Sequence, residues 1–367
     1  MKVAVITRHA ISNYGSLLQS MATQHIIEDL GHTCEIIDYV RDDETYMNRE
    51  KTLLKRKSRW YSNPLKRAIY LALRQPESIM VGKKFANVQK KYLKMSQRYT
   101  TLNQLLNQKP TADVYMTGSD QVWGPVEDGS YDSSYCLSFT EESDKRISYA
   151  SSFGRTEMTD ETVGFFLKWL SRYNSIAVRE DSAVTLLSTI GLTSMQVLDP
   201  TLLLDAREWE KYIEATVMGK YVLVYQLHND KKLSEYAKKV AKKKGLPLIR
   251  ISATFHQFIR GGKFVWAPKI GEFLSYIKNA ECMITDSFHG TAFAINFNTP
   301  FVGVLPNNNT GTRNMSILTL TGLSDRILTD KGDLNLAEKK VDFSYANKVL
   351  AEKRIESFEI LRQMIEE

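Results

Sequence analysis

The feature that most constrains the fold is a repeated alternation of short apolar runs with amphipathic helical patterns. Residues 3–7 form an apolar run, residues 17–30 carry apolar side chains at helical spacing, and residues 34–39 form a second apolar run. A helix that joins two strands in this way lets them pair in parallel. The chain is therefore expected to begin a parallel α/β sheet.

The same alternation continues and then restarts in the second half of the chain. Apolar runs at 113–117 and 146–150 end in small or polar residues, and the pattern begins again at 175–179. Further strands are predicted at 221–226, 247–252, 282–285 and 301–304, with helices at 181–188, 232–244, 272–279, 291–297 and 345–365. The predicted fold class is α/β, with two Rossmann-like doubly wound lobes, a cleft between them and a C-terminal amphipathic helix.

A length of 367 residues fits two domains of ordinary size. We predict an N-terminal lobe over residues 1–174, which carries a basic insertion at 49–98. A C-terminal lobe is predicted over 175–335. The closing segment, 336–367, is expected to pack back on the first lobe as a helix.

Composition excludes several classes of protein. A hydrophobic content of 43% excludes disorder, and no apolar run approaches the roughly 18 residues that span a bilayer. The start of the chain is interpreted as a buried strand rather than a signal peptide, so a cytoplasmic location is expected. Three widely separated cysteines, Cys34, Cys136 and Cys282, offer neither a disulfide framework nor a CxxC site, and are expected to be small core residues.

The positive charge of the chain is concentrated in one segment. Between Arg49 and Arg98 there are 15 Lys and Arg and two acids, a segment charge of +13, although the whole chain carries only +7. Leu65, Ile69 and Trp60 add apolar and aromatic side chains to this segment. One interpretation is contact with an anionic membrane, on the inner face of the plasma membrane; the other is a solvated helical insertion that packs on its own domain.

The most informative segment for chemistry is 285–291, which lies between a predicted buried strand and an apolar helix. Its backbone N–H groups and the helix dipole favour an anionic ligand. Ser287 and Thr291 add hydroxyl groups, Gly290 allows close backbone approach, and His289 could hand a proton to a substrate. A hydrogen-bonded structural His is the alternative.

Here the sequence resembles a known family. Residues 271–274, 285–290 and 300–301 are similar to the signature of the polysaccharide pyruvyl transferase family, with Thr285-Asp286-Ser287-Phe288-His289-Gly290 at its centre. Similar blocks occur in the same order over about residues 1–326, at 13–19, 117–123, 148–154, 178–182, 198–202 and 313–323. The basic segment lies outside every block.

The resemblance implies two lobes of the glycosyltransferase-B type. It also implies an enzyme that transfers the pyruvyl group of phosphoenolpyruvate onto two hydroxyls of a sugar, which gives a cyclic ketal and phosphate. We expect it to act in bacterial surface polysaccharide biosynthesis, on a lipid-linked acceptor. No cofactor, no metal and no nucleic acid are expected as partners.

On the donor side, the family's essential His falls on His289, which becomes the predicted acid. Arg179 matches an Arg that holds phosphoenolpyruvate; its alternative role is a salt bridge to Glu180 or Asp181. Many family members carry Arg where Ser287 stands. The predicted donor-binding residues are Arg179, Ser287, Phe288, Gly290, Thr291, Arg313 and Arg250.

On the acceptor side, Asp120 follows a predicted strand and could deprotonate or orient a sugar hydroxyl, or could instead cap its own turn. Asn13, Tyr14 and Gln121 are predicted to bond sugar hydroxyls. Trp123 could stack on a sugar ring or lie in the core.

The sequence lacks the motifs of several other enzyme classes, since it has no GxxxxGK[ST], no GxGxxG after the first strand and no HExxH. Two alternatives to pyruvyl transfer remain open. One is a glycosyltransferase with a nucleotide-sugar donor, because the same fold serves that chemistry. The other is a nonenzymatic protein that binds lipid or nucleic acid through the basic segment.

Overall fold

A computed structural model describes residues 1–306, 311–329 and 332–367 of the chain. The chain forms two compact units. Unit 1 comprises Met1–Pro200 and Phe358–Glu367, and unit 2 comprises Thr201–Ser357. Each unit is built on one parallel sheet, as the alternating pattern predicts.

Unit 1 contains a seven-stranded sheet in the order β3-β2-β1-β4-β5-β6-β7. All six pairings are parallel. The strand order reverses between β1 and β4, which makes this pair the topological switch point of the sheet. The strands are β1 (Lys2–Ile6), β2 (Thr33–Tyr39), β3 (Met95–Tyr99), β4 (Val114–Thr117), β5 (Lys145–Ser151), β6 (Ser175–Val178) and β7 (Met195–Gln196).

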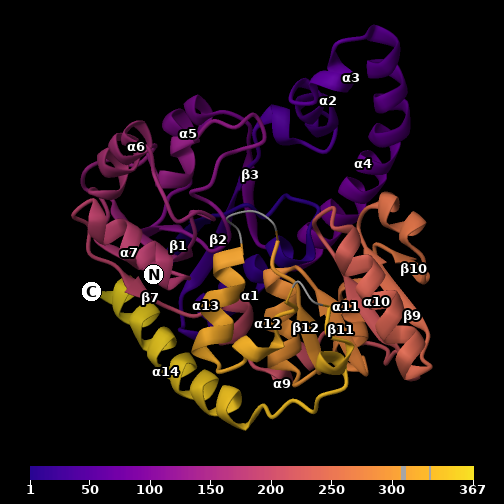
Figure 1. Ribbon diagram of the computed structural model, residues 1–367. Coiled ribbons are helices and arrows are strands. Elements are labelled where there is room, and N and C mark those ends of the chain that lie inside the picture. The colour runs from indigo at the N-terminus through magenta and orange to yellow at the C-terminus, as the bar shows by residue number, and fades with distance from the viewer. Residues whose placement is uncertain (307–310, 330–331) are drawn as a thin grey trace. The chain divides into compact units, whose positions relative to one another are not determined.

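The helices of unit 1 connect these strands. Three of them, α2 to α4, form an arm that stands away from the strands beside β3 (Figure 1). The helices are α1 (Tyr14–Asp29), α2 (Arg49–Lys55), α3 (Ser58–Tyr61), α4 (Pro64–Tyr92), α5 (Leu102–Gln108), α6 (Asp160–Leu170) and α7 (Asp181–Thr189), with 3-10 turns η1 (Asp42–Glu44) and η2 (Ser133–Cys136). Helix α8 (Pro200–Leu203) begins where the two units divide.

Unit 2 contains a five-stranded parallel sheet in the order β10-β9-β8-β11-β12, and its switch point lies between β8 and β11. The strands are β8 (Val222–Tyr225), β9 (Leu248–Ser252), β10 (Lys263–Trp266), β11 (Cys282–Thr285) and β12 (Phe301–Gly303). The helices are α9 (Ala206–Glu210), α10 (Lys231–Lys244), α11 (Ile270–Lys278), α12 (Phe288–Asn296) and α13 (Thr312–Leu320), with 3-10 turns η3 (Phe255–Arg260), η5 (Ser324–Arg326) and η6 (Leu334–Ala337).

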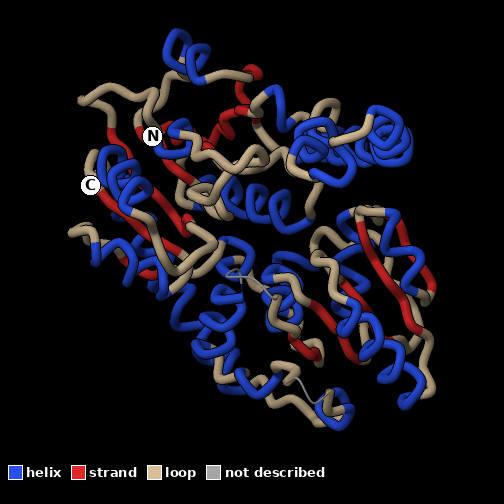
Figure 2. The backbone as a smooth tube through the Cα atoms, turned by 45° about the horizontal axis from the view of Figure 1, so that its top comes forward, coloured by secondary structure: helices blue, strands red, loops and turns tan. Residues whose placement is uncertain are grey.

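Both faces of the unit 2 sheet are covered by helices (Figure 2). On one face Val222, Val224 and Ile284 pack with Leu233 and Val240 of α10. On the other, Tyr225 meets Phe273 of α11 edge to face, with ring centroids 5.1 Å apart. Strands buried on both faces are continuous apolar runs, which explains why β8 and β11 are conspicuous in the sequence.

Two predicted boundaries are wrong. The predicted lobe boundary at 174/175 falls inside the first sheet, because β6 pairs with β5 and β7 pairs with β6. The predicted basic insertion, 49–98, is not wholly an insertion, since its last residues form strand β3 beside β2.

The closing helix α14 (Ser344–Glu366) is shared between the units. Its first part belongs to unit 2, where Arg354 donates to the Leu202 carbonyl at 2.8 Å. Its last part belongs to unit 1, where Lys145 donates to the Ile365 carbonyl at 2.9 Å. Among the described residues, no helix combines the length and the apolar composition needed to cross a membrane. Cys34, Cys136 and Cys282 are buried and unpaired with one another, as expected of core residues.

A buried carboxylate joins three elements of unit 1. Asp38 on β2 contacts the ring of His9 at 3.0 Å and accepts from Arg98 of β3 at 2.7 Å. Burial raises the pKa of Asp38, but the hydrogen bonds to His9 and Arg98 outweigh it and leave the pKa below the usual 3.8. The ionised form is therefore the one that stabilises the fold.

We predict that Asp38→Asn lowers the free energy of unfolding by about 1–3 kcal/mol at pH 7. The pKa of Asp38 is lower in the folded protein than in the unfolded chain. The Asp38 carboxylate therefore stabilises the fold at pH values above its unfolded pKa, and this stabilisation is lost as the pH falls through its folded pKa. The difference in free energy of unfolding between wild type and Asp38→Asn, measured with urea, should therefore shrink below about pH 4. The exposed Asp29→Asn is the control, with an effect below about 1 kcal/mol. A pH-independent difference for Asp38→Asn would contradict this assignment.

Candidate functional site

Two loops meet at the switch point of the unit 2 sheet, and one carboxylate holds them together. Asp286 follows β11, and its two oxygens accept from the backbone N–H groups of Leu227 and His228, which follow β8, at 2.7 and 3.0 Å. The His228 ring lies 3.3 Å from the same carboxylate. The carboxyl ends of β8 and β11 therefore form a fixed edge at the place where α/β sheets bind ligands.

Helix α12 begins at this edge, and the candidate acid lies in its first turn. The helix starts at Phe288, with Ser287 as the N-cap, rather than at Thr291 as predicted. The Ser287 hydroxyl accepts from the Gly290 N–H at 3.2 Å. His289 is only 5% exposed, and its ring meets that of Phe288 edge to face at 5.1 Å. A helix N-terminus favours an anion at this position.

Gly290 and Thr291 lie in the first part of α12, and both are buried. A side chain at Gly290 would meet the Thr285 hydroxyl at 2.5 Å and the Met283 methyl at 3.0 Å. Gly290 therefore allows α12 to pack closely on β11, and the approach of its backbone to a ligand stays a prediction. Thr291 is fully buried, and within the described ranges no group bonds its hydroxyl.

Arg250 and Arg313 lie in different surroundings within unit 2. Arg250 on β9 is fully buried, and its guanidinium donates to Gln226 at 3.0 Å and to the Gly261 carbonyl at 3.4 Å. Burial and the neighbouring Arg260 lower the pKa of Arg250 to about 10. Arg313 lies in the first turn of α13 and is partly exposed.

The switch point of unit 1 brings Asp120 beside the start of α1. Asp120 follows β4 with a left-handed backbone (φ 79°), and its carboxylate accepts from the Ser16 hydroxyl at 2.6 Å and the Gln121 N–H at 2.8 Å. The second contact is the turn-capping role that the sequence left open. A non-glycine residue at positive φ costs free energy, so the surrounding contacts must hold it there.

Arg179 lies in a buried cluster of charges at the same edge. Its guanidinium donates to Asp199 at 2.8 Å and lies 3.5 Å from Glu180. Burial lowers the pKa of Arg179, but Asp199, Glu180 and Asp120 outweigh it and raise the pKa, so the side chain is charged. The predicted placement of Arg179 in the C-terminal lobe is wrong, because β6 belongs to the sheet of unit 1.

Serine hydroxyls complete this cluster. Ser119 donates to Asp199 at 2.8 Å, and Ser152 donates to Glu180 at 2.6 Å. Sequence reasoning did not single out Asp199, Glu180 or Ser16 as site residues. The available signal was their position: each follows a strand of the parallel sheet or opens the helix after one.

The predicted acceptor-binding residues are mostly occupied by structural contacts. Asn13 is the N-cap of α1 and accepts from the Gly15 N–H at 2.8 Å. Tyr14 is 2% exposed and packs on Phe85. The Gln121 amide lies against Gly154, where a Cβ would clash with it.

Trp123 is a core residue, so the prediction that it stacks on a sugar is wrong. It is 1% exposed, its ring packs against Phe153 at 4.9 Å, and its indole N–H donates to the Tyr135 carbonyl at 3.2 Å. No face of the ring is open to a ligand in this arrangement.

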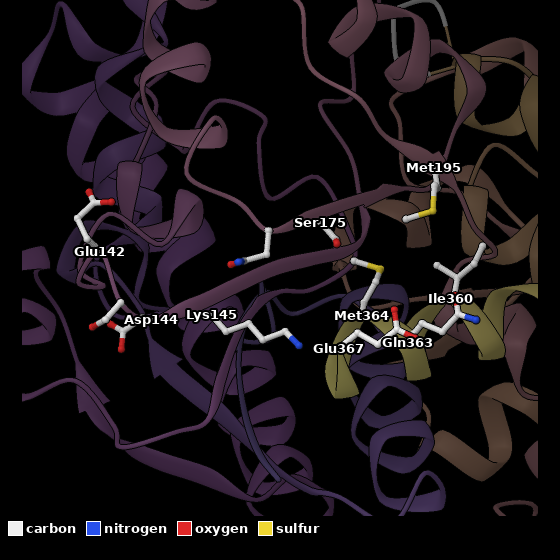
Figure 3. Close-up of a pocket in the computed structure, with 11 residues that line it drawn as sticks. Glu142, Asp144, Lys145, Ser175, Met195, Ile360, Gln363, Met364 and Glu367 are labelled. Atoms are coloured by element: carbon white, nitrogen blue, oxygen red, sulfur yellow. The ribbon is translucent and has the colours of Figure 1, made fainter.

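A separate cavity of about 530 Å³ lies at the opposite edge of the unit 1 sheet. Figure 3 shows Lys145, Ser175 and Met195, which begin strands β5, β6 and β7, facing Ile360 and Met364 of α14. Because these are the amino ends of the strands, this cavity is distinct from the switch-point edge of unit 1, which lies at their carboxyl ends. Among the described residues, no group of three His, Cys, Asp or Glu could hold a metal ion.

The fold and the two switch-point edges define a two-lobed α/β protein of the glycosyltransferase-B type. Among solved structures, S. aureus MnaA with UDP is similar at 11% identity and a TM-score of 0.50, covering 100% of this chain and 90% of that one. The UDP-GlcNAc 2-epimerase of Methanocaldococcus jannaschii is similar at 14% identity and a TM-score of 0.50, covering 98% and 100%. At these identities the likeness shows the fold alone.

A family model gives a narrower assignment. The polysaccharide pyruvyl transferase model matches residues 13–309, which include both switch-point edges, and the chain belongs to that family. No curated protein matches the sequence significantly.

We predict that Gly290→Ala destabilises unit 2 by about 1–3 kcal/mol, because the added methyl would force α12 away from Thr285 and Met283. Gly164→Ala on α6 is a matched control, since a Cβ there meets nothing within 4 Å and Ala is the better helix former. Urea unfolding measures both. Equal stability of the two variants would contradict the packing role of Gly290.

Proposed function

We propose that the protein transfers the pyruvyl group of phosphoenolpyruvate onto two hydroxyls of one sugar, as a step in the assembly of a bacterial surface polysaccharide. The observation that carries this proposal is the first turn of α12, where a buried His289 follows the Ser287 N-cap at the switch point of the unit 2 sheet. Membership of the pyruvyl transferase family supports it.

The proposed reaction balances without a cofactor. The methylene carbon of phosphoenolpyruvate takes a proton and becomes a methyl group, and positive charge develops on the neighbouring carbon. Two sugar oxygens form bonds to that carbon, and its bond to the phosphate oxygen breaks. Of the two hydroxyl protons lost by the sugar, one is balanced by the new methyl C–H and the other leaves with the phosphate.

We assign the acid of this reaction to His289. An imidazolium is a suitable acid near neutral pH, and general acid catalysis contributes about a hundredfold or more to such rates. The N-terminus of α12 disfavours a positive charge on the ring, whereas a bound phosphate dianion favours it. Protonation of His289 would therefore be coupled to binding of the donor.

We assign donor recognition to the N-terminus of α12 and to Arg179. Ser287 stands where many family members carry Arg, so the donor anion relies on helix N–H groups and on the Ser287 and Thr291 hydroxyls. No described residue bonds the buried Thr291 hydroxyl, which supports this assignment, since such a group costs free energy unless a ligand satisfies it. Arg179 remains charged in its carboxylate cluster and suits a carboxylate or phosphate.

We assign Asp120 to the acceptor. Its carboxylate lies 2.6 Å from the Ser16 hydroxyl, which orients it, and its strained backbone is typical of functional positions. A carboxylate at the carboxyl edge of a parallel sheet can orient or deprotonate a sugar hydroxyl.

We further propose that the acceptor is a lipid-linked oligosaccharide at the inner face of the plasma membrane. The charge of +13 within residues 49–98 supports this, because about 1 kcal/mol of attraction per basic residue near anionic lipid holds a protein reversibly at such a surface. Partners would then be phosphoenolpyruvate, the lipid-linked sugar and the bilayer.

Phosphorus NMR of the protein with phosphoenolpyruvate and candidate sugar acceptors tests the activity. Phosphate should appear only when an acceptor is present, and His289→Ala should lower turnover at least about a hundredfold. Binding of phosphoenolpyruvate, measured by thermal shift, should be partly retained.

The control is His25→Ala, on the exposed side of α1, which should leave turnover unchanged. His289→Gln with an unaltered melting temperature separates loss of the acid from loss of the fold. Nucleotide release from a nucleotide sugar, without phosphate release from phosphoenolpyruvate, would instead establish the glycosyltransferase alternative.

A further inference from the structure

The chemistry of the proposed reaction does not use the arm of unit 1, which comprises α2, α3 and α4 and is here called the basic arm (residues 49–92). The arm is an ordered unit with its own packing. Tyr70 of α4 is buried at its centre, where its hydroxyl donates to Glu50 of α2 at 2.8 Å and its ring lies 4.7 Å from the Lys57 ammonium. Trp60 of α3 packs on the same ring at 5.9 Å.

Only some of the apolar residues of α4 are buried on its inner side. Tyr70, Val81 and Phe85 are buried, and Phe85 packs on Tyr14 of α1. The contact of Phe85 with Tyr14 fixes α4 to the rest of unit 1. A helix that only needed to pack on its own domain would be polar on its other side.

The outer side of α4 instead carries an apolar stripe. Leu65 is 69% exposed, Ile69 44% and Leu73 69%, and their spacing of four residues places them on one face over about 12 Å. Met80 continues the stripe and is also exposed. Trp60 and Tyr61 of α3, just before α4, are 37% and 41% exposed.

Basic side chains surround this stripe. Exposed cations occur on and between α2 and α3, next to Leu65 at the start of the stripe, and after the stripe along α4: Lys51, Lys55, Arg56, Lys57, Arg59, Lys66, Lys83, Lys84, Lys90 and Lys91. The two acids of the segment are engaged within the arm, since Glu50 accepts from Tyr70 and Glu77 pairs with Arg74 at 3.4 Å. The outward field of the arm is therefore positive.

This combination favours one kind of partner. Nucleic acid would satisfy the cations but would leave Leu65, Ile69 and Leu73 in water, because phosphate-binding surfaces offer apolar side chains nothing to bury against. An anionic bilayer satisfies both, since the headgroups attract the cations and the acyl boundary receives the apolar stripe. Exposed Trp and Tyr beside the stripe suit the interface, where aromatic rings with a polar end are stable.

We infer that the basic arm docks on an anionic lipid surface, with the Leu65–Ile69–Leu73 stripe entering the boundary between headgroups and acyl chains and the surrounding Lys and Arg contacting the headgroups. This inference deepens the proposed function, on which it rests for the lipid-linked acceptor. It also explains why a segment outside the family's sequence blocks, residues 49–98, has a net charge of +13 in a chain whose net charge is +7.

Flotation of the full-length protein with vesicles tests the inference. Wild type should float with vesicles of 70% phosphatidylcholine and 30% phosphatidylglycerol and should stay in solution with pure phosphatidylcholine. Leu65→Gln/Ile69→Gln/Leu73→Gln keeps the charge and the helix propensity, and should lower the partition coefficient at least about tenfold. Lys66→Gln/Lys83→Gln/Lys84→Gln should lower it roughly a hundredfold at low salt.

Helix α10 supplies the matched control. It exposes Lys232, Lys239 and Lys242 but no large apolar side chain, so Lys232→Gln/Lys239→Gln/Lys242→Gln should change partition less than twofold. Equal flotation of wild type and the Leu65/Ile69/Leu73 variant would overturn the inference. So would tighter binding of the arm to an oligonucleotide than to anionic vesicles, or a dimer in solution that this variant abolishes.

A second readout separates this inference from the proposed function. Phosphate release from phosphoenolpyruvate, measured with a water-soluble acceptor, should be the same in wild type and in the arm variants, because none of the substituted residues is assigned to the chemistry. Loss of flotation with intact phosphate release supports docking as a separate property. Normal flotation without any phosphate release would refute the proposed reaction but would still support docking of the basic arm on anionic lipid.

Discussion

The candidate chemistry depends on buried carboxylates that pin the loops at the carboxyl edge of each parallel sheet. In unit 2, Asp286 fixes the loop after β8 to the loop after β11 through two backbone N–H groups. In unit 1, Asp120 accepts from Ser16 at the start of α1. Loops held in this way keep their polar groups oriented before any ligand arrives, and oriented dipoles are what stabilise developing charge during a reaction.

Arg179 forms a buried structural salt bridge with the same guanidinium to which we assign donor binding. The guanidinium contacts Asp199 and Glu180, both of which are buried and bonded by serine hydroxyls. A buried pair is costly to break, so removal of Arg179 would damage unit 1 as well as any donor binding. The two interpretations that the sequence left open for this residue are therefore compatible.

Much of the fold follows from patterns that local physics makes visible. Strands buried on both faces, such as β8 and β11, are continuous apolar runs. Helix α10 ends at Gly245, whose backbone is left-handed, as is common for glycine at a helix C-terminus. Edge strand β3 has the polar sequence MSQRY, so no apolar run marks it. The lobe boundary was missed because the alternation does not say which sheet a strand joins; β6 could only be assigned by its pairing with β5. The burial of Trp123 likewise depends on residues distant in sequence, which pattern alone does not bring together.

In the proposed reaction, an acid in the first turn of α12 protonates the methylene carbon of phosphoenolpyruvate while a sugar oxygen attacks the neighbouring carbon. Mass spectrometry of the product formed in D₂O tests this most directly. The account predicts one deuterium in the methyl group of a pyruvate ketal, one phosphate released for each ketal formed, and almost no product from His289→Gln. A full yield of deuterated ketal from His289→Gln, or no consumption of phosphoenolpyruvate by wild type with any sugar acceptor, would contradict it.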